Sequence, residues 1–193
     1  MRPRPPPLPP IEAVAGHKLF FALRPDEQAA ERIARAAAAE HVARGLVPRF
    51  RPSRIFHITL HYFGRFEGEP DPQLVAQAMR AAAELVWPAF DVGFERFASW
   101  GREGARQHPF VLTGGQSLEA VRELRDALAD RLVDHGLPAV KDYEPHLTLR
   151  YDKRPAPAWE VDLAGWTASE LVLVSSPQGL TQHDVIARWP LQG

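Results

Sequence analysis

The sequence predicts an α+β protein with largely antiparallel sheets, formed by a unit that occurs twice. Runs with the length of strands outnumber the helical segments, which is typical of α+β folds. The order strand, helix, glycine, loop, strand is repeated, and each copy ends in a His-x-Thr-Leu tetrapeptide, at 57–60 and at 146–149. The two histidines stand 89 positions apart (146 − 57), and the same offset relates Phe21 to Phe110. We therefore infer two halves related by pseudo-two-fold symmetry.

Size and composition narrow the possible functions. With 193 residues and 45% apolar side chains, the chain has the size of one domain with a substantial core. Its 23 Lys and Arg nearly balance 24 Asp and Glu, so an anionic ligand must be bound by a local cluster rather than a global field. The absence of cysteine excludes disulfides, thiolate catalysis and Cys-based metal centres.

The N-terminus differs in composition from the rest of the chain. The first ten residues are mostly proline and lack the apolar run of a signal peptide, so we expect residues 1–15 to form a disordered Pro-rich tail. Residues 16–193 then form a single domain. No apolar segment approaches the roughly 20 residues that span a bilayer. We expect a monomer in the cytoplasm with no membrane partner.

The first unit begins with an apolar strand over 17–23, ended by Arg24-Pro25. Asp26 is placed as the N-cap of a helix over 26–44, and Gly45 stands at its stop position. After a loop with two prolines, residues 54–63 form the first His-x-Thr strand.

The segment between the units contains one helix and one strand. Asp71-Pro72 supplies an N-cap and a proline at the first helical position of a helix that runs to about Val86. Imperfect apolar alternation predicts a strand over 90–100, and the polar stretch 101–108 is expected to be an exposed loop.

The second unit repeats the first. A strand over 109–113 and a Gly-Gly turn precede a helix that we expect Ser117 to cap and Gly136 to stop. The second His-x-Thr strand covers 145–151, and a Pro-rich linker follows at 154–158. Two strands close the chain, over 168–175 and 183–189.

The tetrapeptides suit phosphodiester chemistry. Alternate side chains of a strand share a face, so each His lies beside its Thr while the apolar residues face a core. Cleavage of a cyclic phosphate needs a base for water and an acid for the leaving oxygen, and two imidazoles can supply both near pH 7. The threonine hydroxyls can bond the negative charge that develops on the phosphate oxygens.

Metal ligation is the main competing use of the histidines. His57 and His61 have HxxxH spacing, but on a strand this step spans roughly 13 Å and separates the two side chains. No dense carboxylate cluster adjoins either motif. We therefore expect a metal-independent mechanism without a cofactor.

Several sequence features together resemble a known family, the two-histidine phosphoesterase superfamily, and within it the 2'-5' RNA ligase-like branch, also called RNA 2',3'-cyclic phosphodiesterase. The likeness covers nearly the whole chain beyond the tail. The features that carry it are the paired motifs at 57–60 and 146–149, the strand at 19–23, Phe63-Gly64, Pro145, and the terminal segment 187–191.

The resemblance implies a bilobal fold of two mainly antiparallel sheets around a central groove, with the helices packed outside. It also implies hydrolysis of 2',3'-cyclic phosphate at RNA or nucleotide ends to a 2'-phosphate, with reversible 2'-5' ligation in some members. By motif position, His57 is the proton donor and His146 the proton acceptor. Thr59 and Thr148 hold the phosphate.

One departure from the family pattern concerns an arginine after the second motif. The family commonly carries it at the position of Tyr151, whereas this chain has Arg150 one residue earlier. By strand alternation Arg150 shares the face of His146 and Thr148, so we predict that it binds phosphate. The further candidate contacts to RNA are His61, Arg54, Phe20 and Tyr151.

The remaining candidates are a basic run, which has two interpretations, and the histidines outside the motifs. The run that contains Arg49, Arg51 and Arg54 is either a solvated loop or a clamp for RNA phosphates. The histidines outside the motifs are assigned to surface or core: His17, His41, His108, His135 and His183.

Three other functions remain open at this point. One is a non-catalytic module that binds RNA ends or nucleotides. Another is the same chemistry on a different small cyclic phosphodiester. The third is a metal-dependent hydrolase.

Overall fold

The computed structural model describes residues 16–101, 104–139 and 143–192, so the tail predicted over 1–15 lies outside the described residues. The strands are β1 (His17–Leu23), β2 (Ile58–Phe66), β3 (Phe90–Ser99), β4 (His108–Thr113), β5 (Leu147–Asp152), β6 (Trp159–Ala168), β7 (Glu170–Pro177) and β8 (Asp184–Pro190). The helices are α1 (Glu27–Ala43), α2 (Pro72–Ala83) and α3 (Glu119–Asp134), with 3-10 turns η1 (Ser53–Ile55) and η2 (Gln116–Leu118). The predicted α+β class is confirmed.

The strands form one antiparallel sheet in the order β6-β3-β4-β5-β2-β1-β7-β8. The two motif strands, β5 and β2, are therefore central neighbours, and each has the first strand of its own unit on its outer side. Only one residue pair, Ile58 with Leu147, joins these two strands in the ladder. The expectation of two separate sheets is corrected to one sheet whose halves meet along a narrow seam.

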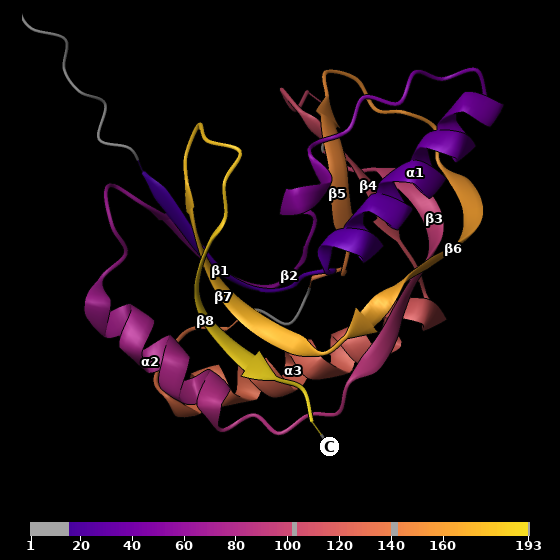
Figure 1. The fold of residues 1–193 in the computed structure, drawn as a ribbon. Coiled ribbons are helices and arrows are strands. Elements are labelled where there is room, and N and C mark those ends of the chain that lie inside the picture. The colour runs from indigo at the N-terminus through magenta and orange to yellow at the C-terminus, as the bar shows by residue number, and fades with distance from the viewer. Residues whose placement is uncertain (1–15, 102–103, 140–142, 193) are drawn as a thin grey trace, which may run out of the picture.

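The helices cover one face of this sheet. All three contribute buried side chains to a single apolar cluster with alternate residues of the strands, such as Leu19 and Phe21 of β1 and Ile58 of β2. Helices α2 and α3 contact each other, and α1 packs against β6 (Figure 1). None of the helices in the described ranges has the length and apolar character needed to cross a bilayer.

The opposite face of the sheet carries a much smaller apolar cluster. It consists of Phe20, Ala22, Val172 and Val174, with Val185 packed against it. The alternation of the motif strands directs the histidine and threonine side chains toward this face.

Local sequence signals explain the helix ends. The side chain of Asp26 accepts a hydrogen bond from the Ala29 amide at 2.7 Å, and that of Asp71 accepts one from Gln73 at 2.8 Å. Both predicted N-caps are confirmed. Gly45 follows α1 with a φ of +70°, a conformation that favours glycine.

Sequence patterning missed one strand and misplaced one helix cap. The linker predicted over 154–158 is confirmed, but the strand β6 that follows it was not predicted. Ser117 does not cap α3 with its side chain. Instead the carboxylate of Glu95, on β3, accepts hydrogen bonds at 2.8 Å from the amides of Gly115 and Ser117. This cap comes from a residue distant in sequence, which local patterning does not reveal.

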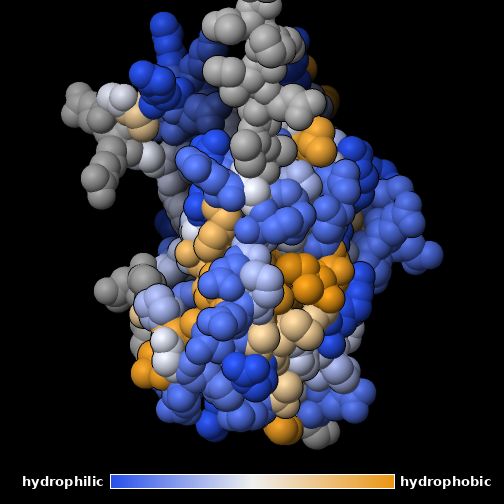
Figure 2. All heavy atoms as spheres, turned by 90° about the vertical axis from the view of Figure 1, so that its left-hand side faces the viewer, coloured by the Kyte–Doolittle hydropathy of each residue, from blue (hydrophilic) through white to orange (hydrophobic). Residues whose placement is uncertain are grey.

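A hollow of about 650 Å³ lies between α2 and β8 and is lined largely by apolar side chains, including Val75, Met79 and Ile186. Figure 2 looks at this side of the molecule and shows hydrophobic side chains gathered among hydrophilic ones. Neither motif histidine lines this hollow, so it is not the site of the chemistry that the motifs predict.

Candidate active site

The seam between the two motif strands places the four motif side chains together. Ile58 and Leu147 are paired and are completely buried in the helix-covered core. In an antiparallel pair the residues to either side oppose each other, so this register sets His57 against Thr148 and Thr59 against His146 on the other face. The two histidines thus lie on a diagonal, each beside the threonine of the other motif.

Aromatic rings fix the orientation of each histidine. The ring of His57 lies 5.0 Å from Phe20 and 4.8 Å from His183, measured between centroids. The ring of His146 lies 4.5 Å from Trp100 and 5.4 Å from Tyr143. These neighbours limit the directions in which the imidazoles can point.

The hydrogen bonds of the two imidazoles are equivalent. Nδ1 of His57 donates to the carbonyl of Ile55 at 2.9 Å, and Nδ1 of His146 donates to the carbonyl of Glu144 at 2.9 Å. In each case the acceptor is two residues upstream. Because a carbonyl only accepts, the neutral rings carry their proton on Nδ1, and Nε2 is unprotonated and able to accept a hydrogen bond or a proton.

The environment keeps both imidazoles neutral. Burial lowers the pKa of His57 to about 3, and the neighbouring ionisable ring of His183 acts in the same direction. Burial also lowers the pKa of His146, against the opposing effect of its bond to the Glu144 carbonyl. In the unliganded protein at pH 7 both Nε2 atoms can therefore accept a proton. A bound phosphate would raise these pKa values, because a nearby anion favours the charged form.

These shifts predict how stability depends on pH. The pKa of His183 is lowered to about 4, mainly by burial, and that of His57 to about 3, whereas both titrate near 6.5 in an unfolded chain. As the pH falls below about 6.5, these histidines bind protons in the unfolded state but not yet in the folded state, so the free energy of unfolding decreases. The slope per histidine is at most about 1.4 kcal/mol per pH unit.

Urea unfolding at a series of pH values between neutrality and about pH 4 would measure this slope. His183→Gln should give a shallower decrease than the unsubstituted protein. Parallel curves for the two proteins would contradict the proposed origin of the acid sensitivity.

A cavity of about 190 Å³ adjoins the first motif. Beside His57 and Thr59, its lining includes Lys18, Phe20, Arg51, Tyr62, Tyr151 and His183. The predicted RNA contacts Phe20 and Tyr151 thus line the same cavity as His57. Arg54 is not among the lining residues; it is exposed, and its Nη2 lies 3.4 Å from the carbonyl of Thr181 in the β7–β8 loop.

A bulge after the first motif changes which side chains reach this cavity. Strand β2 pairs Thr59 with Ala22 but His61 with Phe21, so one extra residue is inserted at Leu60. The prediction that His61 shares the face of His57 is therefore wrong. His61 is 8% exposed, with its ring 4.5 Å from that of Phe63.

The second motif is followed by an equivalent bulge. Strand β5 pairs Thr148 with Val111 but Arg150 with the core residue Phe110. The prediction that Arg150 shares the face of His146 is wrong for this reason. Its guanidinium lies 4.4 Å from the Phe110 ring, and its Nε donates to Asp152 at 2.7 Å. The bulges instead direct Tyr62 and Tyr151 to the cavity.

Sequence reasoning missed His183 and Tyr143 and left Arg51 open between two interpretations. His183 was assigned to surface or core, yet it lines the cavity and contacts His57. Arg51 lines the same cavity. Tyr143 bridges the two motifs, because its hydroxyl is hydrogen-bonded to Thr59 and lies 3.2 Å from Nδ1 of His146. The basic run was the only signal that pointed toward Arg51, and no motif marks the other two.

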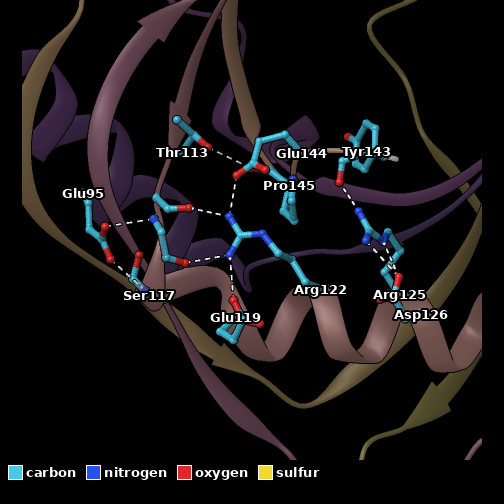
Figure 3. A network of polar contacts seen from close by, with 12 residues as sticks. Glu95, Thr113, Ser117, Glu119, Arg122, Arg125, Asp126, Tyr143, Glu144 and Pro145 are labelled. Atoms are coloured by element: carbon cyan, nitrogen blue, oxygen red, sulfur yellow. Dashed lines mark hydrogen bonds and ion pairs between the residues drawn. The ribbon is translucent and has the colours of Figure 1, made fainter. Parts of the chain in front are cut away.

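A polar network holds the segment that leads to His146 (Figure 3). Arg122 of α3 pairs with Glu144 and also donates at 2.7 Å to the carbonyls of Gly114 and Gly115. The hydroxyl of Thr113 donates to the carbonyl of Pro145 at 3.0 Å. Because the Glu144 carbonyl accepts from His146, this network sets the position of the second imidazole.

Within the described ranges, no group of three or more His, Asp or Glu side chains is arranged to hold a metal ion. The Nδ1 atoms of both motif histidines already donate to carbonyls. Two neutral imidazoles with unprotonated Nε2 atoms are able to transfer protons.

An antiparallel sheet with helices on one face and two His-x-Thr motifs meeting at the centre of the other defines a two-histidine phosphoesterase architecture. A family model described as the 2'-5' RNA ligase superfamily matches residues 24–178. The chain belongs to the 2'-5' RNA ligase superfamily, as its motifs predicted. This membership supports an enzyme with a phosphoesterase-type function. No curated protein matches the chain in sequence.

Solved structures share the fold. The apo form of E. coli LigT has a TM-score of 0.71 at 20% identity, covering 93% of this chain and 99% of LigT. The protein TT0787 of Thermus thermophilus has a TM-score of 0.66 at 20% identity, covering 91% and 98%. E. coli LigT complexed with phosphate has a TM-score of 0.66 at 19% identity, covering 93% and 99%. The chain therefore has the LigT fold.

Proposed function

We propose that this protein hydrolyses RNA 2',3'-cyclic phosphate ends to 2'-phosphates by a metal-independent mechanism with two histidines. The observation that carries the proposal is the register that sets His57 and His146 on a diagonal across the central seam, with both Nδ1 atoms bound to carbonyls and no hydrogen-bond partner for either Nε2 atom among the described residues. Such an arrangement allows proton transfer on two sides of one phosphorus atom.

In the proposed reaction, Nε2 of His146 takes a proton from water as the water oxygen attacks phosphorus. Protonated His57 gives its proton to the 3' oxygen as the P–O3' bond breaks, which leaves a 2'-phosphate. His57 is neutral in the free protein, so it must gain its proton when the anionic substrate binds and raises its pKa. After this step His57 is neutral again, as in the free protein, and His146 carries the proton taken from water, which it loses to solvent.

The threonines and the cavity complete the proposed site. Thr59 and Thr148 donate to the non-bridging oxygens, whose negative charge grows in the transition state. Tyr151, which is half exposed, offers its ring to the terminal base, and the buried Phe20 lines the same cavity. LigT has been solved with phosphate and with 3'-AMP, which supports a nucleotide phosphate as the ligand of this fold.

We also propose that the two halves are related by a pseudo-two-fold axis through the seam. The strand order places equivalent strands at equal distances from the centre, and both motif strands carry a bulge directly after the threonine. Such symmetry would explain why each imidazole donates to the carbonyl two residues upstream. It leaves the choice of acid and base to the different surroundings of the two rings.

The test is turnover of nucleoside 2',3'-cyclic phosphates and of short RNA with a cyclic end, in excess chelator. We expect hydrolysis with a nucleoside 2'-phosphate as the product. Tight binding of the 2'-phosphate without hydrolysis would favour a non-catalytic binding module instead. Activity that appears only on added zinc or manganese would contradict the proposed mechanism, and turnover of a different cyclic phosphodiester alone would reassign the substrate.

A further inference from the structure

Two cationic side chains, Lys18 and Arg51, line the cavity beside His57. Arg51 lies on the loop between α1 and η1, and its backbone amide donates to the carbonyl of Leu149 at 2.7 Å. This bond holds the loop against β5, one residue beyond Thr148. Arg51 is thus attached to the second motif strand while it lines the cavity of the first.

The guanidinium of Arg51 lies close to the reacting groups. It is 5.7 Å from the centre of the Tyr151 ring, which also lines the cavity. Its positive charge lowers the pKa of both His57 and His183, whereas that of Lys18 contributes only to the shift of His183. Of the two cations, Arg51 is the better placed to act on a phosphate in front of His57.

The guanidinium is also available for a ligand. Among the described residues, no carboxylate forms an ion pair with Arg51, in contrast to Arg150, which donates to Asp152 and lies over Phe110. A guanidinium presents several N–H donors in a planar fork that matches two oxygens of a phosphate. A half-buried guanidinium at the edge of a cavity favours the interpretation of Arg51 as an anion-binding residue over that of a residue in a solvated loop.

We propose that Arg51 binds a non-bridging oxygen of the substrate phosphate and is the phosphate-binding cation of this site, a role that Arg150 cannot fill from its position beside the core. The inference rests on the proposed function, because it assigns the residue that neutralises the phosphate in that reaction. It also resolves the two interpretations of the basic run, since Arg51 alone of its three arginines lines the cavity.

The experiment compares Arg51→Ala, Arg51→Lys, Arg150→Ala and the exposed neighbour Arg49→Ala. Inorganic phosphate is titrated into each 15N-labelled protein, and kcat and KM are measured with a nucleoside 2',3'-cyclic phosphate. We expect Arg51→Ala to weaken phosphate binding by about 10-fold and to lower kcat/KM by about 10²-fold. Arg51→Lys should recover part of both losses, and Arg49→Ala should match the unsubstituted protein.

A second readout separates phosphate binding from a merely structural role. Loss of the Arg51 charge should move the titration of the His57 ring to higher pH in NMR spectra, with no such change in Arg49→Ala. Equal phosphate affinity in Arg51→Ala and Arg49→Ala, or a loss of affinity in Arg150→Ala alone, would overturn the proposal. If the unsubstituted protein binds phosphate but does not turn over cyclic phosphates, the proposed function fails while the phosphate titration still tests Arg51.

Discussion

Replacement of either motif histidine by alanine is expected to lower kcat for a nucleoside 2',3'-cyclic phosphate by about 10²- to 10⁴-fold, the usual contribution of general acid–base catalysis. His57→Ala removes the proposed donor to the leaving oxygen, and His146→Ala removes the proposed acceptor from water. The double variant should lose little more than the worse single variant, because the two groups act in one step.

His135→Ala is the matched control for these variants. His135 pairs with Glu84 at 2.9 Å at the end of α3 and takes no part in the cavity beside His57. Its kcat should stay within about twofold of the unsubstituted protein, since surface substitutions away from a site have small effects. Unchanged turnover in both His57→Ala and His146→Ala would rule out the two-histidine mechanism.

Replacement of either motif threonine by valine is the second change that we expect to lower kcat strongly. Valine keeps the branched shape of threonine but removes the hydroxyl, so Thr59→Val and Thr148→Val test the hydrogen bonds rather than the packing. Loss of one donor to a developing oxyanion costs about 10²- to 10³-fold in kcat. We expect losses in this range, with thermal unfolding used to confirm that each variant is folded.

Thr167→Val provides the control for the threonine variants. Its hydroxyl donates to Asp91 at 2.6 Å on the exposed outer part of the sheet. If Thr59→Val and Thr148→Val change kcat no more than Thr167→Val does, the motif threonines serve only as β-branched strand residues.

Strand alternation located the motif side chains but failed one residue beyond each motif. The two-residue period of a strand correctly places Thr59 on the face of His57 and Thr148 on the face of His146, because the strands are regular up to that point. The bulges that follow depend on how β2 pairs with β1 and how β5 pairs with β4, and those partners lie far away in the sequence. Arg150 was therefore assigned to the wrong face.

Much of the fold was predictable because its signals are local. The apolar strand runs, the aspartate N-caps and the glycine stops need only a few neighbouring residues. The joining of both halves into one sheet was not predictable, because it depends on the single pair of Ile58 and Leu147. The edge strand β6 was missed although Trp159, Val161 and Leu163 alternate with polar residues.

The parts of the site that sequence reasoning missed come from outside the motifs. His183 reaches His57 from the loop between β7 and β8, and Tyr143 lies on the segment before the second motif. Neither position has a periodic pattern or a spacing that marks it. Contacts between loops of different units become visible only when the register of the sheet is known.

The central claim is that His57 and His146 act on opposite sides of one phosphate. A crystal structure with a bound nucleoside 2'-phosphate tests it most directly. The account predicts that the Nε2 atoms of both histidines lie about 3 Å from oxygens of the same phosphate group, on opposite sides of the phosphorus atom. A phosphate bound in the groove that contacts only one imidazole, or neither, would contradict it.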